Sequence, residues 1–418
     1  MTTAMNDFSL GATYWPRRKG SLLWANFDRG EIREEFQQLA AIGLNTIRLP
    51  LHWEEFQPRP ERVAVGALRM LEQTLAQASD ARLRVVPQLF PLSVAGAIHL
   101  PAWTTAASYA ADLTLATKFG PLLIVRSETR PPLVWERTSH ETEVRDLWTN
   151  PAMRAAQRKL IEEVIGNFAD HPVIRGWELG SGIELARTPS SSDAAAEWLG
   201  ETFDVARQHG ARGALFYSAP LRSLVRREGP RPEAITQAGG TPAISLVPPE
   251  PAFTGQPLTI ELLRFVAALT YSLGRAAPVL VVGAPAVVNA AGKVFADRAY
   301  GRAVEQPLLD PDAYATLVET ALPELRAAGV PGVWLSHAFC YGEPFVPAEA
   351  HSRREQMMGL FDIGGDELPV GKAVQRFGQQ PGTQQEARLP LLDTEDYWQD
   401  PAANFRRLWQ QWQTPDES

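Results

Sequence analysis

The chain has 418 residues, of which 45% are apolar, and a formal net charge of −8 at neutral pH. This length allows either two domains of ordinary size or one large α/β barrel with insertions. Nucleic acid is excluded as an expected partner, because phosphate binding needs clustered lysine and arginine and the charges here are spread along the chain. A single cysteine, Cys340, excludes an internal disulfide and a cysteine-based zinc cluster.

Export and membrane insertion are also disfavoured by the sequence. The first ten residues, MTTAMNDFSL, have neither a basic region nor an apolar core, so we expect no signal peptide. A membrane span needs about 20 apolar residues, and the most apolar stretch, 265–291, is interrupted too often to supply them. The interruptions are Gly274, Arg275, Pro278 and Pro285. These features predict a soluble, cytoplasmic protein.

The first helix in chain order has signals at both ends. Asp28 stands at the N-cap position, and Glu31, three residues later, completes a capping box. Gly43 closes the helix, since glycine readily adopts the left-handed conformation that ends helices. The apolar residues between these ends fall on one helical face: Ile32, Phe36, Leu39 and Ala40.

Three more helices are predicted farther along the chain. One runs from a cap at Asn150 to about Phe168, with proline at its first position. The remaining two lie between Ser192 and Gly210 and between Asp312 and Gly329.

Short apolar runs alternate with these helices, which is typical of βα units and a parallel sheet. Eight such runs favour a (β/α)8 TIM barrel over a doubly wound sheet. The active face of such a barrel is formed by the loops that leave the carboxyl ends of the strands. The predicted strands are centred near Ala12, Ile47, Val86, Trp177, Phe216, Leu246, Leu280 and Trp334.

Two segments fall outside this alternation. A long insertion, at about 91–149, follows the third strand and is expected to act as a lid or binding loop. The barrel itself is assigned to 1–377, and 378–418 to a linker rich in Gln, Gly and Pro followed by a helical segment that packs on the barrel. Four residues are expected to dock that helix: Trp398, Leu408, Trp409 and Trp412.

Five segments spread along the chain carry a family pattern: GATYWP with FDRGEIREEFQQLAAIGLNTIRLPLHWEEFQP, LRVVPQLFPLSVAGAIHLPAW, NPAMRAAQRKLIEEVIGNFADHPVIRGWELG, GVWLSHAFCYGEP and REQMMGLFDIGGDELPVGKAVQRF. In these segments the chain resembles the clan-A glycoside hydrolases, specifically the family 5 and endo-β-mannanase-like branch. The resemblance covers nearly the whole chain and implies a barrel of carbohydrate metabolism, although a shared fold does not establish a function.

The resemblance also implies where catalytic carboxyl groups should lie. Retaining glycosidases need two of them about 5–5.5 Å apart, and the family places them at the ends of the fourth and seventh strands. Here Gly182 holds the acid/base position, after Ser181 at the position of the family's Asn. The nucleophile position falls on Val282 or Gly283.

A shifted alignment cannot restore the nucleophile, because 262–296 contain no Asp or Glu. Two other family positions are also substituted. The Tyr of the sixth strand is replaced by Val247-Pro248, and the Trp of the eighth strand by Ser336. Together these changes indicate a dismantled catalytic site.

Displaced carboxylates are the alternative explanation. On the fourth strand, Glu178 and Glu184 point the same way as Gly182, but about 13 Å below and about 7 Å beyond it at about 3.3 Å per residue. Glu250 and Glu343 follow later strands, and Glu343 is the favoured candidate among the four.

The remaining candidates concern binding rather than chemistry. Arg48 matches the buried Arg of the family's second strand and is expected to form an ion pair with Glu178 inside the barrel. Neither a metal ion nor another cofactor is expected, since His-x-x-x-His spacing and phosphate-binding glycine motifs are missing. The candidate substrate-binding residues are Arg48, Trp53, His99, Trp103, Trp177, Ser181, Ser336 and His337, with Trp53 and Trp103 the favoured sugar platforms.

Three functional hypotheses follow. The favoured one is a pseudo-glycosidase that binds a carbohydrate ligand, with a protein partner also considered, and lacks classical retaining hydrolysis. The second is an active mannanase-like β-glycoside hydrolase that uses relocated carboxylates. The third is a structural or assembly protein that docks through its tryptophan-rich terminal helix.

Overall fold

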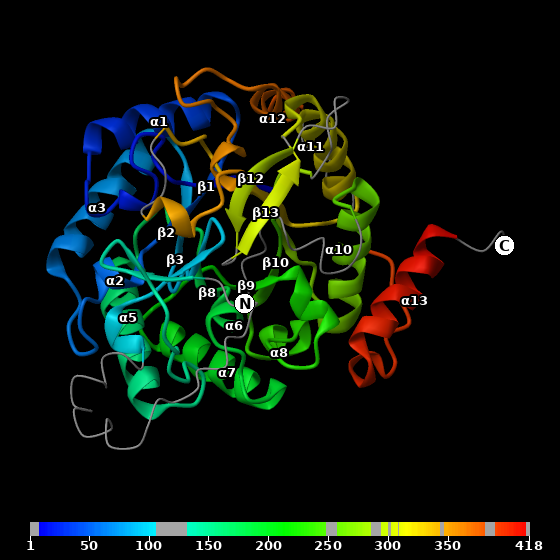
Figure 1. The fold of residues 1–418 in the computed structure, drawn as a ribbon, viewed down its shortest axis with the longest axis horizontal. Helices are drawn as coiled ribbons and strands as arrows, with labels where there is room; N and C mark the ends of the chain where they lie inside the picture. Colours follow the sequence, from blue (N-terminus) through cyan, green and yellow to red (C-terminus); the bar gives the residue numbers. More distant parts are fainter. Residues whose placement is uncertain are drawn as a thin grey trace.

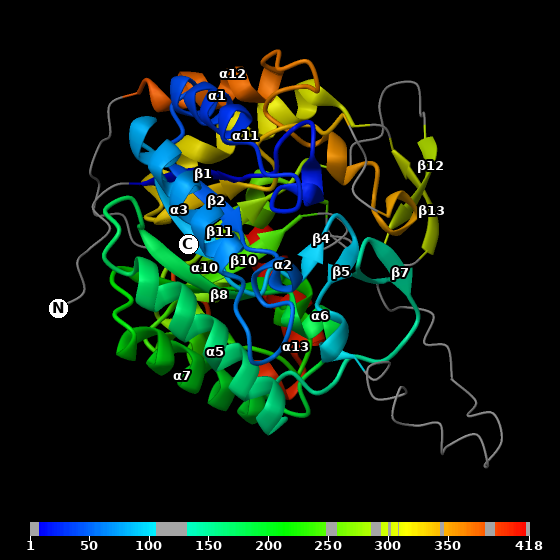
Figure 2. The same cartoon turned by 90° about the vertical axis from the view of Figure 1, so that its left-hand side faces the viewer.

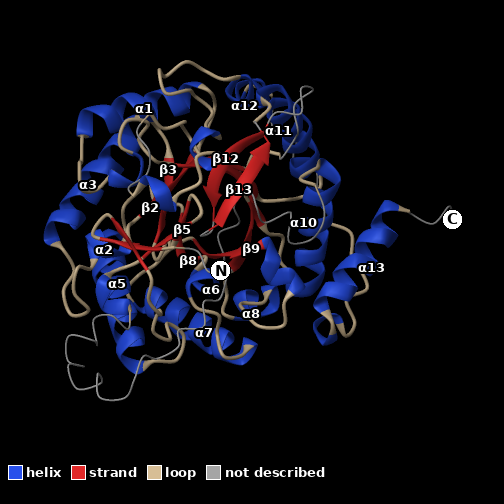
Figure 3. Cartoon of the chain, in the orientation of Figure 1, coloured by secondary structure: helices blue, strands red, loops and turns tan. Residues whose placement is uncertain are grey.

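Eight parallel strands close into a barrel with helices packed around its outside (Figures 1 and 3). The structure is a computed structural model and describes residues 8–105, 132–247, 257–285, 294–299, 302–307, 309–342, 347–380 and 389–414. The strand order is β1-β14-β11-β10-β9-β8-β3-β2, and all eight strands contain the residues predicted as their centres. Their bounds are β1 Ser9–Thr13, β2 Thr46–Pro50, β3 Arg84–Gln88, β8 Gly176–Ser181, β9 Ala214–Pro220, β10 Thr241–Leu246, β11 Val279–Val282 and β14 Gly332–Leu335.

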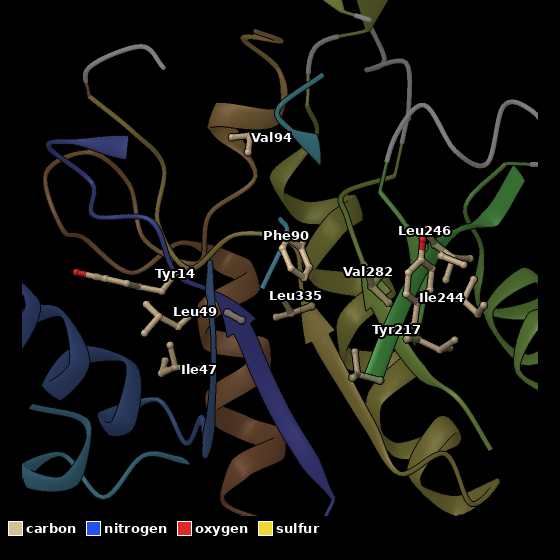
Figure 4. Packing of buried hydrophobic residues seen from close by; sticks show 14 of the residues in the cluster. Tyr14, Ile47, Leu49, Phe90, Val94, Tyr217, Ile244, Leu246, Val282 and Leu335 are labelled. Carbon is tan, nitrogen blue, oxygen red and sulfur yellow. The ribbon is translucent and has the colours of Figure 1, made fainter. Parts of the chain in front are cut away.

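Alternate residues of these strands face the two sides of the barrel wall. One set fills the interior, where Val281 and Trp334 pack against Phe216, Val86, Ala243 and Val279. The other set packs beneath the surrounding helices, as Figure 4 shows for Ile244, Val282 and Leu335. The barrel is therefore a filled core, and a ligand has to bind at one of its ends.

The surrounding helices begin at caps that the sequence indicates. The carboxylate of Asp28 accepts hydrogen bonds from the backbone of Gly30 and Glu31, and Asn150 caps its helix in the same way. Glu31 forms an ion pair with Lys19 at 2.9 Å. Two helices begin one or two residues earlier than predicted: their N-caps are Ser191, where Ser192 was expected, and Asp310, where Asp312 was expected. The helices are α1 Arg29–Ala41, α3 Val65–Asp80, α5 Pro151–Phe168, α7 Ser192–Gln208, α8 Pro232–Gln237, α10 Ile260–Gly274, α11 Pro311–Ala327 and α12 Pro369–Gly378.

Three excursions from the barrel lie on the side where the strands end (Figure 2): the insertion after β3, the hairpin after β11 and the loop after β14. The predicted insertion after β3 forms a four-stranded sheet, and its residues 106–131 lie outside the described chain. The hairpin after β11 was missed from the sequence. Their strands are β4 Ser93–Val94, β5 Ala97–His99, β6 Leu133–Trp135, β7 Thr138–His140, β12 Val294–Ala299 and β13 Arg302–Pro307. Short helices complete this side and the loops: α2 Trp53–Phe56, α6 Ile183–Ala186, η1 Gly20–Leu22, η2 Ala102–Thr104, η4 Leu221–Val225, η5 Ala348–Ala350 and η6 Glu355–Met357.

Hydrogen bonds tie these excursions to one another. His99, after β3, and His351, after β14, meet Nε2 to Nε2 at 2.7 Å. The carboxylate of Asp297, in the β11 hairpin, accepts from the Ser352 hydroxyl at 2.9 Å and from the Arg353 backbone at 2.9 Å. Three loops far apart in the sequence therefore form one cover beside the end of the barrel.

The C-terminal segment packs against the barrel as predicted. After η7 (Tyr397–Gln399), helix α13 (Pro401–Gln413) lies beside α10 (Figure 1). Phe265 of α10 makes edge contacts with three rings of this helix, with centroid separations of 5.2 to 5.9 Å: Phe405, Trp409 and Trp412. The expected linker falls largely on 381–388, outside the described residues. None of the helices in the described ranges has the length and apolar character needed to cross a membrane.

Candidate functional site

A pocket opens at the carboxyl end of the barrel and measures about 700 Å³ including the part open to solvent. Its walls are built from the ends of the barrel strands and from the loop after β3. Most of the polar side chains that line it are small hydroxyls or neutral groups, as opposed to carboxylates. They are Thr13, Gln88, Ser93, Ser181, Ser218, Ser245, Ser336 and His337, joined by the charged Arg48 and Glu355.

The predicted ion pair between Arg48 and Glu178 is confirmed. The Arg48 Nε donates to Oε2 of Glu178 at 2.6 Å, and Nη2 donates to Oε1 at 2.5 Å. Gln88, on the strand between them, donates to the same Oε1 at 3.1 Å. The Glu178 carboxylate is fully buried behind the guanidinium, while Arg48 itself lines the pocket. Both oxygens of this carboxylate are therefore bound by side chains of the barrel.

Three hydroxyl oxygens complete the surroundings of Arg48. Its Nη2 donates to the Oγ atoms of Ser181 and Ser218, each at 3.2 Å, and its Nη1 donates to Oγ1 of Thr13 at 3.3 Å. Ser181 was identified from the sequence, whereas Ser218 and Thr13 were missed. A hydroxyl residue recurs near the carboxyl ends of several strands, and this pattern could have indicated both residues from the sequence.

Gly182, at the position that the family resemblance assigns to the acid/base residue, lines the pocket and has a backbone that disfavours a side chain. Its φ is 68°, in the left-handed region, and it precedes α6 as its N-cap. A Cβ atom there would lie 3.0 Å from the Cβ of Ser93. A glutamate could enter this position only with local rearrangement.

Val282 and Gly283, the two alternatives for the nucleophile position, face opposite sides of the barrel wall. Val281 lines the pocket, whereas Val282 lies in the cluster beneath the helices (Figure 4). Alternation along the strand places Gly283, which is buried, on the same side as Val281. Of the two alternatives, Gly283 is thus the one on the pocket side of the strand, and it has no side chain.

The two displaced carboxylates that the structure describes, Glu178 and Glu184, are not among the residues that line the pocket. Glu184 accepts hydrogen bonds from the Tyr217 hydroxyl at 2.6 Å and from Ser223 at 3.1 Å, outside the pocket lining. Glu250 and Glu343 lie outside the described residues. The structure instead places Glu355, which was missed, in the pocket wall, and it is the only carboxyl group among the described lining residues.

The two tryptophans favoured as sugar platforms pack away from the pocket. Trp53 is 2% exposed and donates to the Gln57 side chain at 2.8 Å, and Trp103 donates to the Gln57 backbone at 3.1 Å. Trp177 is also a core residue, because it faces the helices while Glu178 faces inward. The tryptophan that does line the pocket is Trp15.

The predicted histidines separate into two environments. His337 lines the pocket beside Ser336, with Nδ1 and Oγ 3.0 Å apart. Burial, together with the positive charge of Arg48, lowers the pKa of His337 to about 3, so its imidazole is neutral. His99 lies outside the lining, bonded to His351. Within the described ranges, no group of three or more His, Cys, Asp or Glu residues is arranged to hold a metal ion.

Solved structures with this fold include several glycoside hydrolases of family 5. A GH5_18 protein from Streptomyces cattleya, in complex with GlcNAc, gives a TM-score of 0.73 at 18% identity, over 97% of this chain and 91% of that one. A single-residue variant from the same organism, in complex with Manβ1-4GlcNAc, gives 0.70 at 17% identity with the same coverage. The exo-β-1,4-mannosidase Op5Man5 from Opitutaceae bacterium strain TAV5 gives 0.66 at 18% identity, over 89% of this chain and 59% of that one. No family model and no curated protein matches the sequence. Identities this low establish the fold, and the function has to be argued from the pocket.

Proposed function

We propose that this barrel binds carbohydrate in the pocket at its carboxyl end and does not cleave glycosides by the two-carboxylate route. The observation that supports the proposal is the composition of the described pocket wall, where many hydroxyls accompany one carboxyl group, Glu355. Hydroxyl, amide and imidazole groups can each exchange hydrogen bonds with the hydroxyl groups of a sugar. The solved structures of similar fold that contain GlcNAc and Manβ1-4GlcNAc make these two sugars the first ligands to test.

Hydrolysis of a glycoside requires two carboxyl groups at a defined separation. Retaining enzymes need two carboxyl groups about 5–5.5 Å apart, and inverting enzymes need them about 6.5–9.5 Å apart. Glu178 is held by Arg48, and Glu184 by Tyr217, so neither is available as the second group. Catalytic groups act as a unit, and loss of one generally lowers turnover by several orders of magnitude.

Glu355 keeps the alternative of an active hydrolase open. A buried carboxyl group in the wall of a pocket is a candidate general acid or nucleophile. Glu250 and Glu343 would then be the candidates for its partner. The assembly hypothesis has less support, because Trp409 and Trp412 of the terminal helix pack on Phe265 of the same chain.

One experiment separates binding from hydrolysis. Reducing-end release is measured at high protein concentration on β-mannan, β-glucan and aryl β-glycosides, and calorimetry measures the binding of Manβ1-4GlcNAc and GlcNAc. We expect binding without release above the buffer blank. Release that disappears in Glu355→Gln but persists in Glu34→Gln, a matched exposed position on α1, would establish the hydrolase instead.

A further inference from the structure

The floor of the pocket concentrates hydrogen-bond donors at one point. Thr13, Ser181 and Ser218 come from three different strands, and each places its hydroxyl oxygen within 3.3 Å of a terminal nitrogen of Arg48. All four side chains line the pocket. A site assembled from β1, β2, β8 and β9 in this way is held rigidly by the barrel.

The hydrogens of these hydroxyls determine what the floor can bind. Each oxygen accepts a hydrogen bond from Arg48, so each hydroxyl still has one hydrogen to donate. Thr13 and Ser218 are 5% and 1% exposed, and among the described residues none of the three hydroxyls has another hydrogen-bond partner. Arg48 Nη1 likewise carries a second N–H beyond the one directed at Thr13. Buried donors without acceptors are costly, so a bound group should supply acceptor oxygens here.

The net charge of the floor limits which acceptor group it can bind. Glu178 balances Arg48 from behind, so the floor presents donors of the guanidinium but little net positive charge. A dianion such as phosphate would lack a full counter-charge and would also meet Glu355 in the pocket wall. A carboxylate carries half of that charge, spread over two oxygens in one plane, and these oxygens match the several donors of the floor.

We propose that this floor binds the carboxylate of an acidic sugar, a hexuronate, while the hydroxyl groups of the sugar face Gln88, His337 and Glu355 in the wall. The inference rests on the proposed carbohydrate function and specifies the class of sugar.

The test compares each hexuronate with its neutral counterpart. Calorimetric titrations use glucuronate, galacturonate and mannuronate, each paired with the parent hexose and with the hexuronate methyl ester, which retains the shape but not the charge. At least one hexuronate should bind about tenfold or more tightly than both of its partners, as expected for a charge-assisted hydrogen bond. Inorganic phosphate is included as the dianion.

Substitutions in the floor test whether its hydroxyls are the groups that bind the carboxylate. Ser218→Ala and Ser181→Ala each remove one donor and retain the Arg48–Glu178 pair. We expect each to lower the affinity for the acid about tenfold more than the affinity for the neutral hexose. Thr13→Val provides a nearly isosteric third case. Its control is Thr270→Val in α10, which removes a buried hydroxyl without a partner and away from the pocket. Thermal unfolding identifies any variant that fails to fold. The variants that do fold then test whether the floor binds the carboxylate.

The outcomes separate the two proposals. Equal binding of hexuronate, hexose and ester overturns the acidic-sugar inference and leaves carbohydrate binding intact. Phosphate bound more tightly than every hexuronate also overturns it, because the floor would then prefer a dianion. Failure of every sugar, neutral or acidic, to bind at millimolar concentration overturns the carbohydrate function itself. A preference for the acid that survives in all three floor variants places the carboxylate elsewhere and overturns the assignment of the floor.

Discussion

Arg48 and Glu178 face each other across β3 and form a two-pronged ion pair inside the barrel, with donor–acceptor distances of 2.6 and 2.5 Å. The pair fixes the base of the pocket, because Arg48 also holds the hydroxyls of Ser181 and Ser218. Removing one member leaves a buried charge without compensation, which costs about 3–5 kcal/mol. Replacing both members by apolar residues of similar volume is often close to neutral.

We therefore expect Glu178→Gln and Arg48→Met to lower the free energy of unfolding by about 3–5 kcal/mol each, and the double variant by clearly less than the sum. Urea unfolding of the natural protein, the two single variants and the double variant gives the free energies of this double-mutant cycle. Additive effects would show that the two side chains do not depend on each other.

The Gly182→Glu variant tests whether the acid/base position alone limits activity. A glutamate there must adopt a left-handed φ of 68° and displace Ser93, which should destabilise the fold by about 1–3 kcal/mol. Hydrolysis of aryl β-glycosides should stay at background, since Gly283 still supplies no nucleophile. The matched control is Gly200→Glu in α7, where the added Cβ meets nothing within 4 Å beyond its chain neighbours and the backbone of its own helix, and where helix propensity favours the change. Turnover appearing in Gly182→Glu would mean that a second carboxylate is already in place.

Acid should weaken the fold through its buried histidines. Burial and the nearby His351 lower the pKa of His52 from 6.5 to about 3, and the pKa of His99 is also lowered, by burial. Between pH 6.5 and 3 the unfolded chain therefore binds protons that the folded protein excludes, so stability present above pH 6.5 is lost as the pH falls. For one such histidine the loss from pH 7 to pH 5 is about 2 kcal/mol.

The His52→Phe variant isolates this effect, because the Nε2 of His52 has no hydrogen-bond partner that the substitution would remove. Burial raises the pKa of Glu35 and of Glu54 to about 7, which acts in the opposite direction over the same range. Those contributions cancel when the variant is compared with the natural protein at each pH. Unfolding in urea at pH 7 and pH 5 should show a smaller loss in the variant, and equal losses would contradict a buried neutral imidazole.

The terminal helix should contribute to the stability of the barrel. Trp409 is 5% exposed and contacts Phe265 edge-on at 5.2 Å, so Trp409→Ala should cost about 3–5 kcal/mol. Arg406→Ala, at an exposed site on the same helix, should change stability by less than about 0.5 kcal/mol. Thermal unfolding compares the two. Equal Tm values for both variants would mean that the helix packs only loosely.

The barrel follows from the sequence because its signals are local. Each strand is a short apolar run, and each helix carries its own cap, as at Asp28 and Asn150, so eight repeats of the pattern indicate the closed sheet. The pair of Arg48 and Glu178 was also predictable, since a buried arginine requires a nearby carboxylate. The sequence alone also shows that position 182 is a glycine and that 262–296 contain no Asp or Glu.

The tertiary structure decided where side chains from distant segments meet. The sequence favours Trp53 and Trp103 as sugar platforms, and only their packing around Gln57 places them outside the pocket. Glu355 lies more than a hundred residues from Ser218, and both line one pocket because the strand ends of a barrel converge. Periodicity records which residues are buried, but not which buried polar groups face one another, since those contacts depend on strand order and loop paths.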